Sequence, residues 1–94
     1  MENKYKLAVT NSFKRDFKKV KKRGCDIELM NDVVDMLLAG EPLPDNNRDH
    51  ALTGNWTGFR ECHIQPDWLL VYQIFEERLI LSLTRTGTHS DLDF

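Results

Sequence analysis

The 94-residue chain is long enough for one hydrophobic core and too short for two, so we expect a single domain over residues 1–94. With 40% hydrophobic and 30% charged residues, its composition is that of a globular protein and excludes a disordered one. The sequence lacks an apolar run as long as a membrane span and begins without the apolar segment of a signal peptide, which predicts a cytoplasmic protein with no membrane partner.

The charge is divided unevenly along the chain. Residues 1–25 carry nine Lys and Arg residues against two Asp and Glu residues, whereas residues 26–94 carry four against thirteen. The net charge of −2 therefore conceals a basic N-terminal segment that can attract phosphates locally. The ordinary alternative is a solvated helix face with no ligand.

The first predicted elements are a short strand over residues 5–9 and a basic helix behind it. Ser12 is the expected N-cap of this helix, and Gly24 is the expected residue after its end. One apolar stripe at helical spacing is formed by Phe13, Phe17 and Val20.

A second helix is predicted between an Asp26 cap and the Gly40 and Pro42 breakers. Its apolar positions at helical spacing are Ile27, Met30, Val33, Val34, Leu37 and Leu38. The two helices are expected to form an αα-hairpin.

The second half of the chain predicts an ordered loop followed by three strands. Residues 41–56 are rich in Pro, Asn, Asp and Gly, which indicates the loop, and residues 59–64, 69–75 and 79–84 have strand patterns. Short connections between the three strands favour an antiparallel meander. The predicted fold class is α+β, with two N-terminal helices packed on one face of a small antiparallel sheet.

All three histidines lie in this second half of the chain. His50 falls in the loop, His63 near the end of a strand and His89 just after the last strand. Strand alternation puts Glu61 on the same face as His63, and Asp67 follows across a turn, where its carboxylate could reach back towards the His63 imidazole. In a meander His89 can approach the same edge.

Four interpretations of this set remain open from the residues alone. The histidines can be incidental, or they can contact RNA or protein without chemistry. They can form a metal site, although neither they nor Cys25 and Cys62 have the local spacing of a zinc motif, and the two cysteines are expected to be reduced. They can also perform acid–base catalysis on RNA, whose 2′-hydroxyl is its own nucleophile, with Arg85 or Arg60 stabilising the developing charge.

Four blocks of sequence resemble one known family. They are residues 48–54 (RDHALTG), 56–64 (WTGFRECHI), 66–72 (PDWLLVY) and 85–90 (RTGTHS), in the order and spacing of the YafQ branch of the RelE/ParE toxin superfamily. The resemblance covers essentially the whole chain.

The resemblance implies a toxin from a bacterial toxin–antitoxin pair with a RelE/ParE-like fold. Such toxins cleave messenger RNA during translation on the ribosome, without a metal or other cofactor, and leave a 2′,3′-cyclic phosphate or 3′-phosphate and a 5′-hydroxyl. The implied partners are mRNA, the ribosome and a DNA-binding, partly disordered antitoxin. The free toxin is expected to be a monomer.

The resemblance also implies roles for individual residues. His89 matches the general acid, His63 and Asp67 act on the 2′-hydroxyl side, and His50 contacts phosphate or tunes the pair. Three residues support them: Arg85 stabilises charge, Glu61 stands where the family has an aspartate, and Phe94 is displaced by one position from the family's terminal aromatic. The residues expected to meet ribosomal RNA are Lys14, Arg15, Lys18, Lys19, Lys21, Lys22 and Arg23.

The alternative within the same superfamily is a non-enzymatic, ParE-like toxin that inhibits a protein such as gyrase. One fold hosts both activities, so only the residues of the site can separate them.

Overall fold

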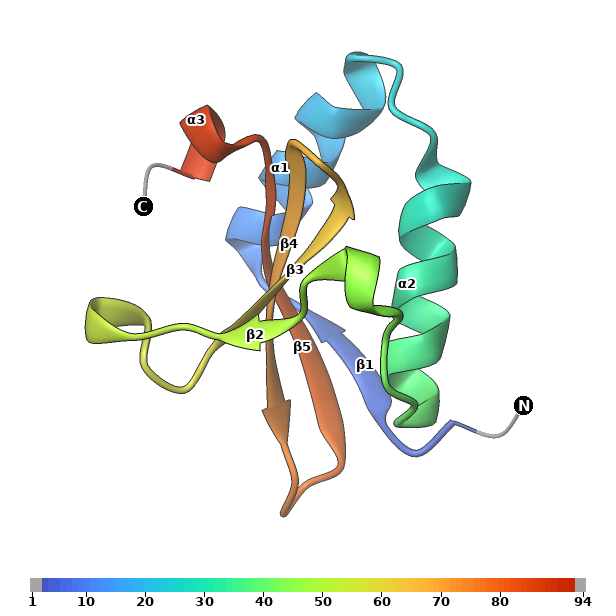
Figure 1. The fold of residues 1–94 in the computed structure, drawn as a ribbon, viewed down its shortest axis with the longest axis vertical. Helices are drawn as coiled ribbons and strands as arrows, with labels where there is room; N and C mark the ends of the chain where they lie inside the picture. Colours follow the sequence, from blue (N-terminus) through green and yellow to red (C-terminus); the bar gives the residue numbers. More distant parts are fainter. Residues whose placement is uncertain (1–2, 93–94) are drawn as a thin grey trace.

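The computed structural model describes residues 3–92 and contains a five-stranded sheet with the strand order β1-β5-β4-β3-β2 (Figure 1). The strands are β1 (Lys6–Val9), β2 (His50–Ala51), β3 (Arg60–Gln65), β4 (Trp68–Phe75) and β5 (Ile80–Gly87). The predicted antiparallel meander is confirmed in β3, β4 and β5. The sheet as a whole is mixed rather than wholly antiparallel, because β1 pairs in parallel with β5.

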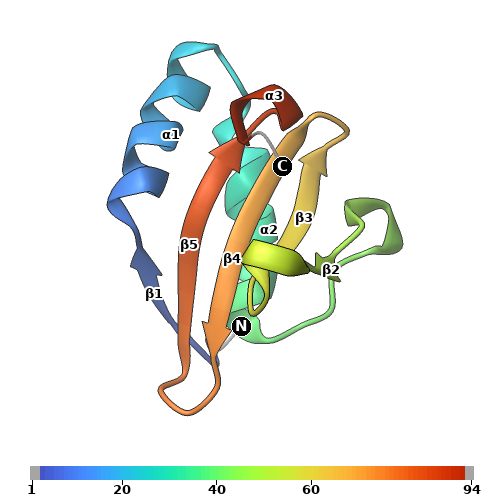
Figure 2. The same cartoon turned by 90° about the vertical axis from the view of Figure 1, so that its left-hand side faces the viewer.

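The two predicted helices are α1 (Asn11–Lys22) and α2 (Ile27–Ala39), and both pack on one face of the sheet. Figure 2 shows α2 behind the strands, with α1 beside β1 and β5. The main core lies between these layers and is formed chiefly by Phe13, Val20, Met30, Val33, Val34, Leu37, Leu38, Cys62, Leu70, Tyr72, Leu81 and Leu83. No helix within residues 3–92 is long and apolar enough to cross a membrane.

The N-cap of α1 is Thr10 and not Ser12, as the sequence had suggested. The Thr10 hydroxyl oxygen accepts the Phe13 backbone N–H at 3.0 Å and also donates to the Thr84 carbonyl at 2.8 Å. The second bond ties the start of the helix to β5, which a Ser12 cap would not do. The cap of α2 is Asp26 as predicted, because its carboxylate accepts the Glu28 backbone N–H at 3.1 Å.

The predicted loop over residues 41–56 contains a short strand that the sequence analysis missed. In β2, His50 lies opposite Glu61 and Ala51 lies opposite Arg60 of β3. A strand of two residues is too short for its alternation to be recognised. The pairing places His50 on the sheet rather than on a free loop.

Strand β5 extends three residues beyond its predicted end. Val71 pairs with Arg85 and Tyr72 pairs with Leu83, so Thr84 is an extra residue in a β-bulge. The sequence did not reveal this extension because Thr86 and its neighbours are polar, and their partners lie elsewhere in the chain.

The other face of the sheet carries a smaller apolar cluster. Leu69 and Val71 of β4 pack there against Leu92 of α3 (His89–Leu92), the short helix after β5. Leu52, Trp56 and Phe59 pack against it, and the ring centroids of Trp56 and Phe59 are 5.3 Å apart in an edge-to-face arrangement. The cluster leaves the remainder of this face open to polar side chains.

Replacing Asp16 should destabilise the fold. This carboxylate is buried at 7% exposure and accepts bonds from Arg85 Nε at 2.6 Å and from the Thr86 backbone N–H at 3.2 Å. Asp16→Ala leaves these donors without their acceptor, and we expect the free energy of unfolding to fall by about 3 kcal/mol in chemical denaturation. In Asp35→Ala, which removes an exposed carboxylate of α2, the change should stay below about 0.5 kcal/mol. Equal losses in the two variants would contradict the role of Asp16.

Candidate active site

Two histidines flank a buried carboxylate on the open face of the sheet. Glu61 is 7% exposed, and its Oε1 lies 3.7 Å from His50 Nε2 and 3.8 Å from His63 Nε2. Glu61 and His63 share a strand face, as predicted, and the β2–β3 pairing brings His50 to the opposite side of Glu61. The carboxylate therefore lies between two imidazoles.

His50 is oriented by its own loop. Its Nδ1 lies 2.6 Å from the Arg48 carbonyl oxygen, and because a carbonyl can only accept, Nδ1 carries the proton. The Nε2 edge of the ring is thereby turned towards Glu61. The preceding residue, Asp49, accepts a bond of 2.5 Å from the Tyr72 hydroxyl, which anchors the loop to β4.

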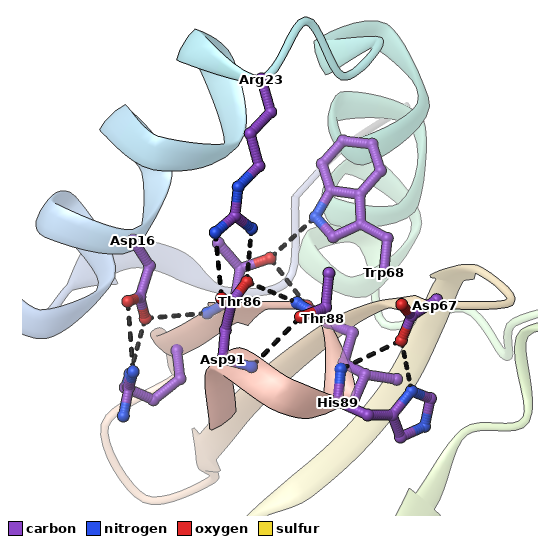
Figure 3. A network of polar contacts seen from close by, with 10 residues as sticks. Asp16, Arg23, Asp67, Trp68, Thr86, Thr88, His89 and Asp91 are labelled. Atoms are coloured by element: carbon purple, nitrogen blue, oxygen red, sulfur yellow. Dashed lines mark hydrogen bonds and ion pairs between the residues drawn. The ribbon is translucent and has the colours of Figure 1, made fainter. Parts of the chain in front are cut away.

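A second carboxylate–histidine pair lies at the end of the sheet. Asp67, in the turn between β3 and β4, has Oδ1 2.6 Å from His89 Nδ1 and 3.0 Å from the His89 backbone N (Figure 3). The sequence had suggested that Asp67 turns back to His63, but its carboxylate binds His89. With Nδ1 bound to Asp67, Nε2 is the nitrogen of the His89 ring that makes no hydrogen bond to another residue within 3–92.

The pKa of Asp67 is lowered by His89. The backbone N–H of His89 contributes most and the bond from its ring follows, because both favour the charged carboxylate. A lowered folded-state pKa means that these bonds stabilise the folded protein above the ordinary pKa of an aspartate. Their contribution is lost as the pH falls through the lowered value.

The histidines His63 and His89 of the two pairs meet at one depression of the surface. The ring centroids of His63 and His89 are 5.7 Å apart, with their planes at 63°. Both rings line a depression of about 490 Å³ whose other lining residues are Asn46, Asn47, Arg48, Ile64, Gln65 and Pro66. A phosphodiester placed here would meet two imidazoles at once.

Arg48 is a candidate that the sequence analysis missed, although it stands in the block around His50. It is exposed at the rim of the depression and has a left-handed backbone with a φ of 49°. The arginines considered from the sequence lie elsewhere. Arg85 is bound to Asp16, and Arg60 lies on the helix-facing side of β3 with Nε 3.4 Å from Asp49 Oδ1. Residue-by-residue spacing could not distinguish these three arginines.

The basic residues expected to bind RNA are all exposed on α1 and at its C-terminal end. Arg23 differs from the rest because its guanidinium binds Asp91 of α3 through two contacts. The Arg23 side chain therefore reaches from the end of α1 to the helix that begins with His89 (Figure 3). Phe94 lies outside the described residues.

Within residues 3–92, no group of three or more His, Cys, Asp or Glu side chains is arranged to hold a metal ion. Cys25 and Cys62 are both free cysteines. Burial raises the pKa of the Cys62 thiol to about 12, so this side chain is a core residue and not a nucleophile.

Comparison with known families identifies the class of protein. Residues 5–93 match the family of bacterial toxins of type II toxin–antitoxin systems, YafQ. The chain belongs to the YafQ family of toxins. The resemblance drawn from the four sequence blocks is thereby confirmed.

Individual relatives agree with this assignment. The "mRNA interferase toxin YafQ" of Escherichia coli K12 is 34% identical over 87 residues, which is 92% of each chain. YafQ in the E. coli DinJ–YafQ toxin–antitoxin complex is 32% identical, with a TM-score of 0.86 over 95% of this chain and 97% of that one. A metal-bound toxin from Helicobacter pylori is 41% identical, with a TM-score of 0.88 over 94% and 98%. These similarities confirm the predicted α+β fold.

The pairing of Asp67 can be tested by titration. In His89→Ala the ring bond is lost and the backbone bond remains, so the pKa of Asp67 should rise part of the way to its ordinary value. Carboxyl carbon chemical shifts measured by NMR over an acid pH series report this pKa directly. In His63→Ala the pKa of Asp67 should equal its wild-type value. A rise in that variant would show instead that Asp67 pairs with His63, as expected from the sequence.

Proposed function

We propose that the chain is a metal-independent endoribonuclease toxin that cleaves translated mRNA on the ribosome and is silenced by a cognate antitoxin. The observation that carries the proposal is the placement of His63 and His89 at one depression, each backed by its own carboxylate. The E. coli relative is named an mRNA interferase, and a similar toxin is paired with the antitoxin DinJ, which supports both the reaction and the partner.

The reaction needs one group to accept the 2′ proton and another to protonate the leaving oxygen. His63 takes the proton from the 2′-hydroxyl as the 2′ oxygen attacks phosphorus. The bond from phosphorus to the 5′ oxygen breaks, and His89 gives that oxygen its proton through Nε2. The products are a 2′,3′-cyclic phosphate and a 5′-hydroxyl, so no metal-bound water is required.

The contacts of the two rings favour this division of roles. Asp67 binds His89 Nδ1 at 2.6 Å, which orients the ring and assigns the proton transfer to Nε2. Glu61 lies 3.8 Å from His63 Nε2, a longer contact that orients the base without forming a hydrogen bond. His50 supports the pair through the shared Glu61 carboxylate.

We assign the stabilisation of the developing phosphate charge to Arg48 and not to Arg85. Arg48 is exposed beside the depression, whereas the Arg85 guanidinium is held by the buried Asp16 carboxylate. A cation at the rim can stabilise the negative charge that develops on the non-bridging oxygens during attack. Further from the depression, the basic face of α1 meets ribosomal RNA phosphates through salt-sensitive contacts.

Removal of either central histidine should abolish most of the activity. We expect His89→Ala and His63→Ala each to lower the cleavage rate at least about 10²-fold, because each group transfers a proton in the rate-limiting step. Cleavage is measured by mapping 5′ ends on messages in purified translation reactions. Arg78→Gln, an exposed change in the turn between β4 and β5, should cleave at the wild-type rate.

Two outcomes of this experiment would contradict the proposal. Growth arrest by the wild-type toxin with intact messages would favour inhibition of a protein target such as gyrase. Loss of cleavage on adding a chelator of transition metals, with Mg²⁺ kept free for the ribosome, would show that a metal takes part. The metal-bound H. pylori toxin makes this second measurement necessary.

Arg48→Gln should slow cleavage by about tenfold, and by no more than about 10²-fold, because an exposed cation is partly screened by solvent. The effect should fall on the rate at saturating ribosomes, since the charge is needed most in the transition state. Arg48→Lys keeps the charge at the rim and should recover most of the rate. If Arg48→Gln cleaves like the wild type, charge stabilisation must come from another group.

A further inference from the structure

Arg23 and Asp91 join the end of α1 to α3. Arg23 Nη1 lies 2.5 Å from Asp91 Oδ2, and Nη2 lies 3.0 Å from Oδ1, so the guanidinium binds both carboxylate oxygens side by side. Two parallel bonds of this kind fix an orientation as well as a distance, and only arginine provides them. Of the basic residues at α1, Arg23 thus points to the protein's own acidic group.

Asp91 is also the centre of a capping arrangement. Its Oδ2 accepts the Thr88 backbone N–H at 2.9 Å, and the Thr88 hydroxyl oxygen accepts the Asp91 backbone N–H at 3.1 Å (Figure 3). These reciprocal bonds form a capping box around His89. A Cβ on Gly87 would lie 2.8 Å from Asp91 Oδ2, so the strand end is shaped to admit this carboxylate.

A helix as short as α3 cannot hold its position by itself. It has four residues, fewer than an isolated helix needs for stability, and Leu92 is its buried apolar anchor. The orientation of the first residue, His89, therefore depends on the polar contacts at this end of the helix.

Two carboxylates lie at the start of this short helix. Asp67 binds His89, which lowers the pKa of Asp67, and Asp91 within the helix is a neighbouring like charge that opposes this shift. Arg23 supplies the opposing charge at Asp91 and is the main cause that lowers the pKa of Asp91 far below its usual range. Arg23 thereby balances the charge of Asp91 beside the Asp67–His89 pair.

We propose that Arg23 is a positioning residue that, through Asp91, holds the segment carrying His89 in its place beside His63. The inference deepens the proposed function and rests on it for the role of His89. Arg23 acts through Asp91, which its guanidinium binds, and not as a group that transfers a proton.

The test uses Arg23→Gln with Lys22→Gln as its matched control. Both variants remove one positive charge from the exposed end of α1, but only Arg23 binds Asp91. Two readouts are measured on the full chain: hydrogen exchange of the Thr88, His89 and Asp91 backbone amides by NMR, and the kcat and KM of message cleavage on ribosomes. Chemical denaturation checks that both variants remain folded.

In Arg23→Gln we expect amide exchange at Thr88 and His89 to accelerate about fivefold and kcat to fall by a similar factor. In Lys22→Gln exchange should match the wild type, and only KM should rise, because that lysine serves phosphate binding. Arg23→Lys restores the charge without the paired bonds, so its exchange should lie between those of Arg23→Gln and the wild type. Asp91→Asn should reproduce the Arg23→Gln effects.

The exchange readout separates this inference from the proposed function. Wild-type exchange and kcat in Arg23→Gln, with cleavage still lost in His89→Ala, would overturn the positioning role alone. Accelerated exchange in Arg23→Gln, with wild-type toxin cleaving no message, would support the positioning of the segment and overturn the catalytic function. Exchange in Arg23→Lys equal to that of the wild type would overturn the need for a bidentate pair.

Discussion

The placement of the site depends on one buried carboxylate in α1. Asp16 accepts bonds from the Arg85 side chain and from the Thr86 backbone N–H. These bonds anchor the last paired residues of β5, which lie beyond the bulge at Thr84. Gly87 and the short helix α3 follow directly, so the position of His89 at the sheet edge is set from α1 and not by local sequence alone.

The two carboxylate–histidine pairs differ in their surroundings, and this difference gives them different chemistry. In the inner pair the side chains of Glu61 and His63 are 9% and 15% exposed, whereas in the outer pair Asp67 and His89 are 67% and 58% exposed. The inner pair is fixed by the strand on which it lies. The outer pair stands in water, where an ion pair alone contributes little. Additional contacts to the backbone of the outer pair therefore hold the His89 imidazole in position beside that of His63.

The sequence predicted the helices and strands that are determined by nearby residues. It failed for those that are determined by a pairing partner far along the chain. Both helices, the three-strand meander and the shared face of Glu61 and His63 follow from period and capping chemistry. The parallel pairing of β1, the two-residue β2 and the polar end of β5 depend on partners far along the chain. The same reason explains the candidate site. The histidines were found by residue type, but the attachment of Asp67 to His89 rather than to His63 depends on how the strand ends meet in space.

The charge division along the chain acquires a physical meaning in this arrangement. Had the basic residues been spread evenly, the acidic second half would repel a phosphate backbone from the depression at every approach. Concentrated on α1, they form one attractive face whose end reaches α3 through Arg23 and Asp91. Arg23 is thus an exposed member of the basic surface that also supports α3 through Asp91. Under the proposed function, α1 gives this overall acidic protein a basic face for the nucleic acid, and Arg23 joins the end of that face to the helix that begins with His89.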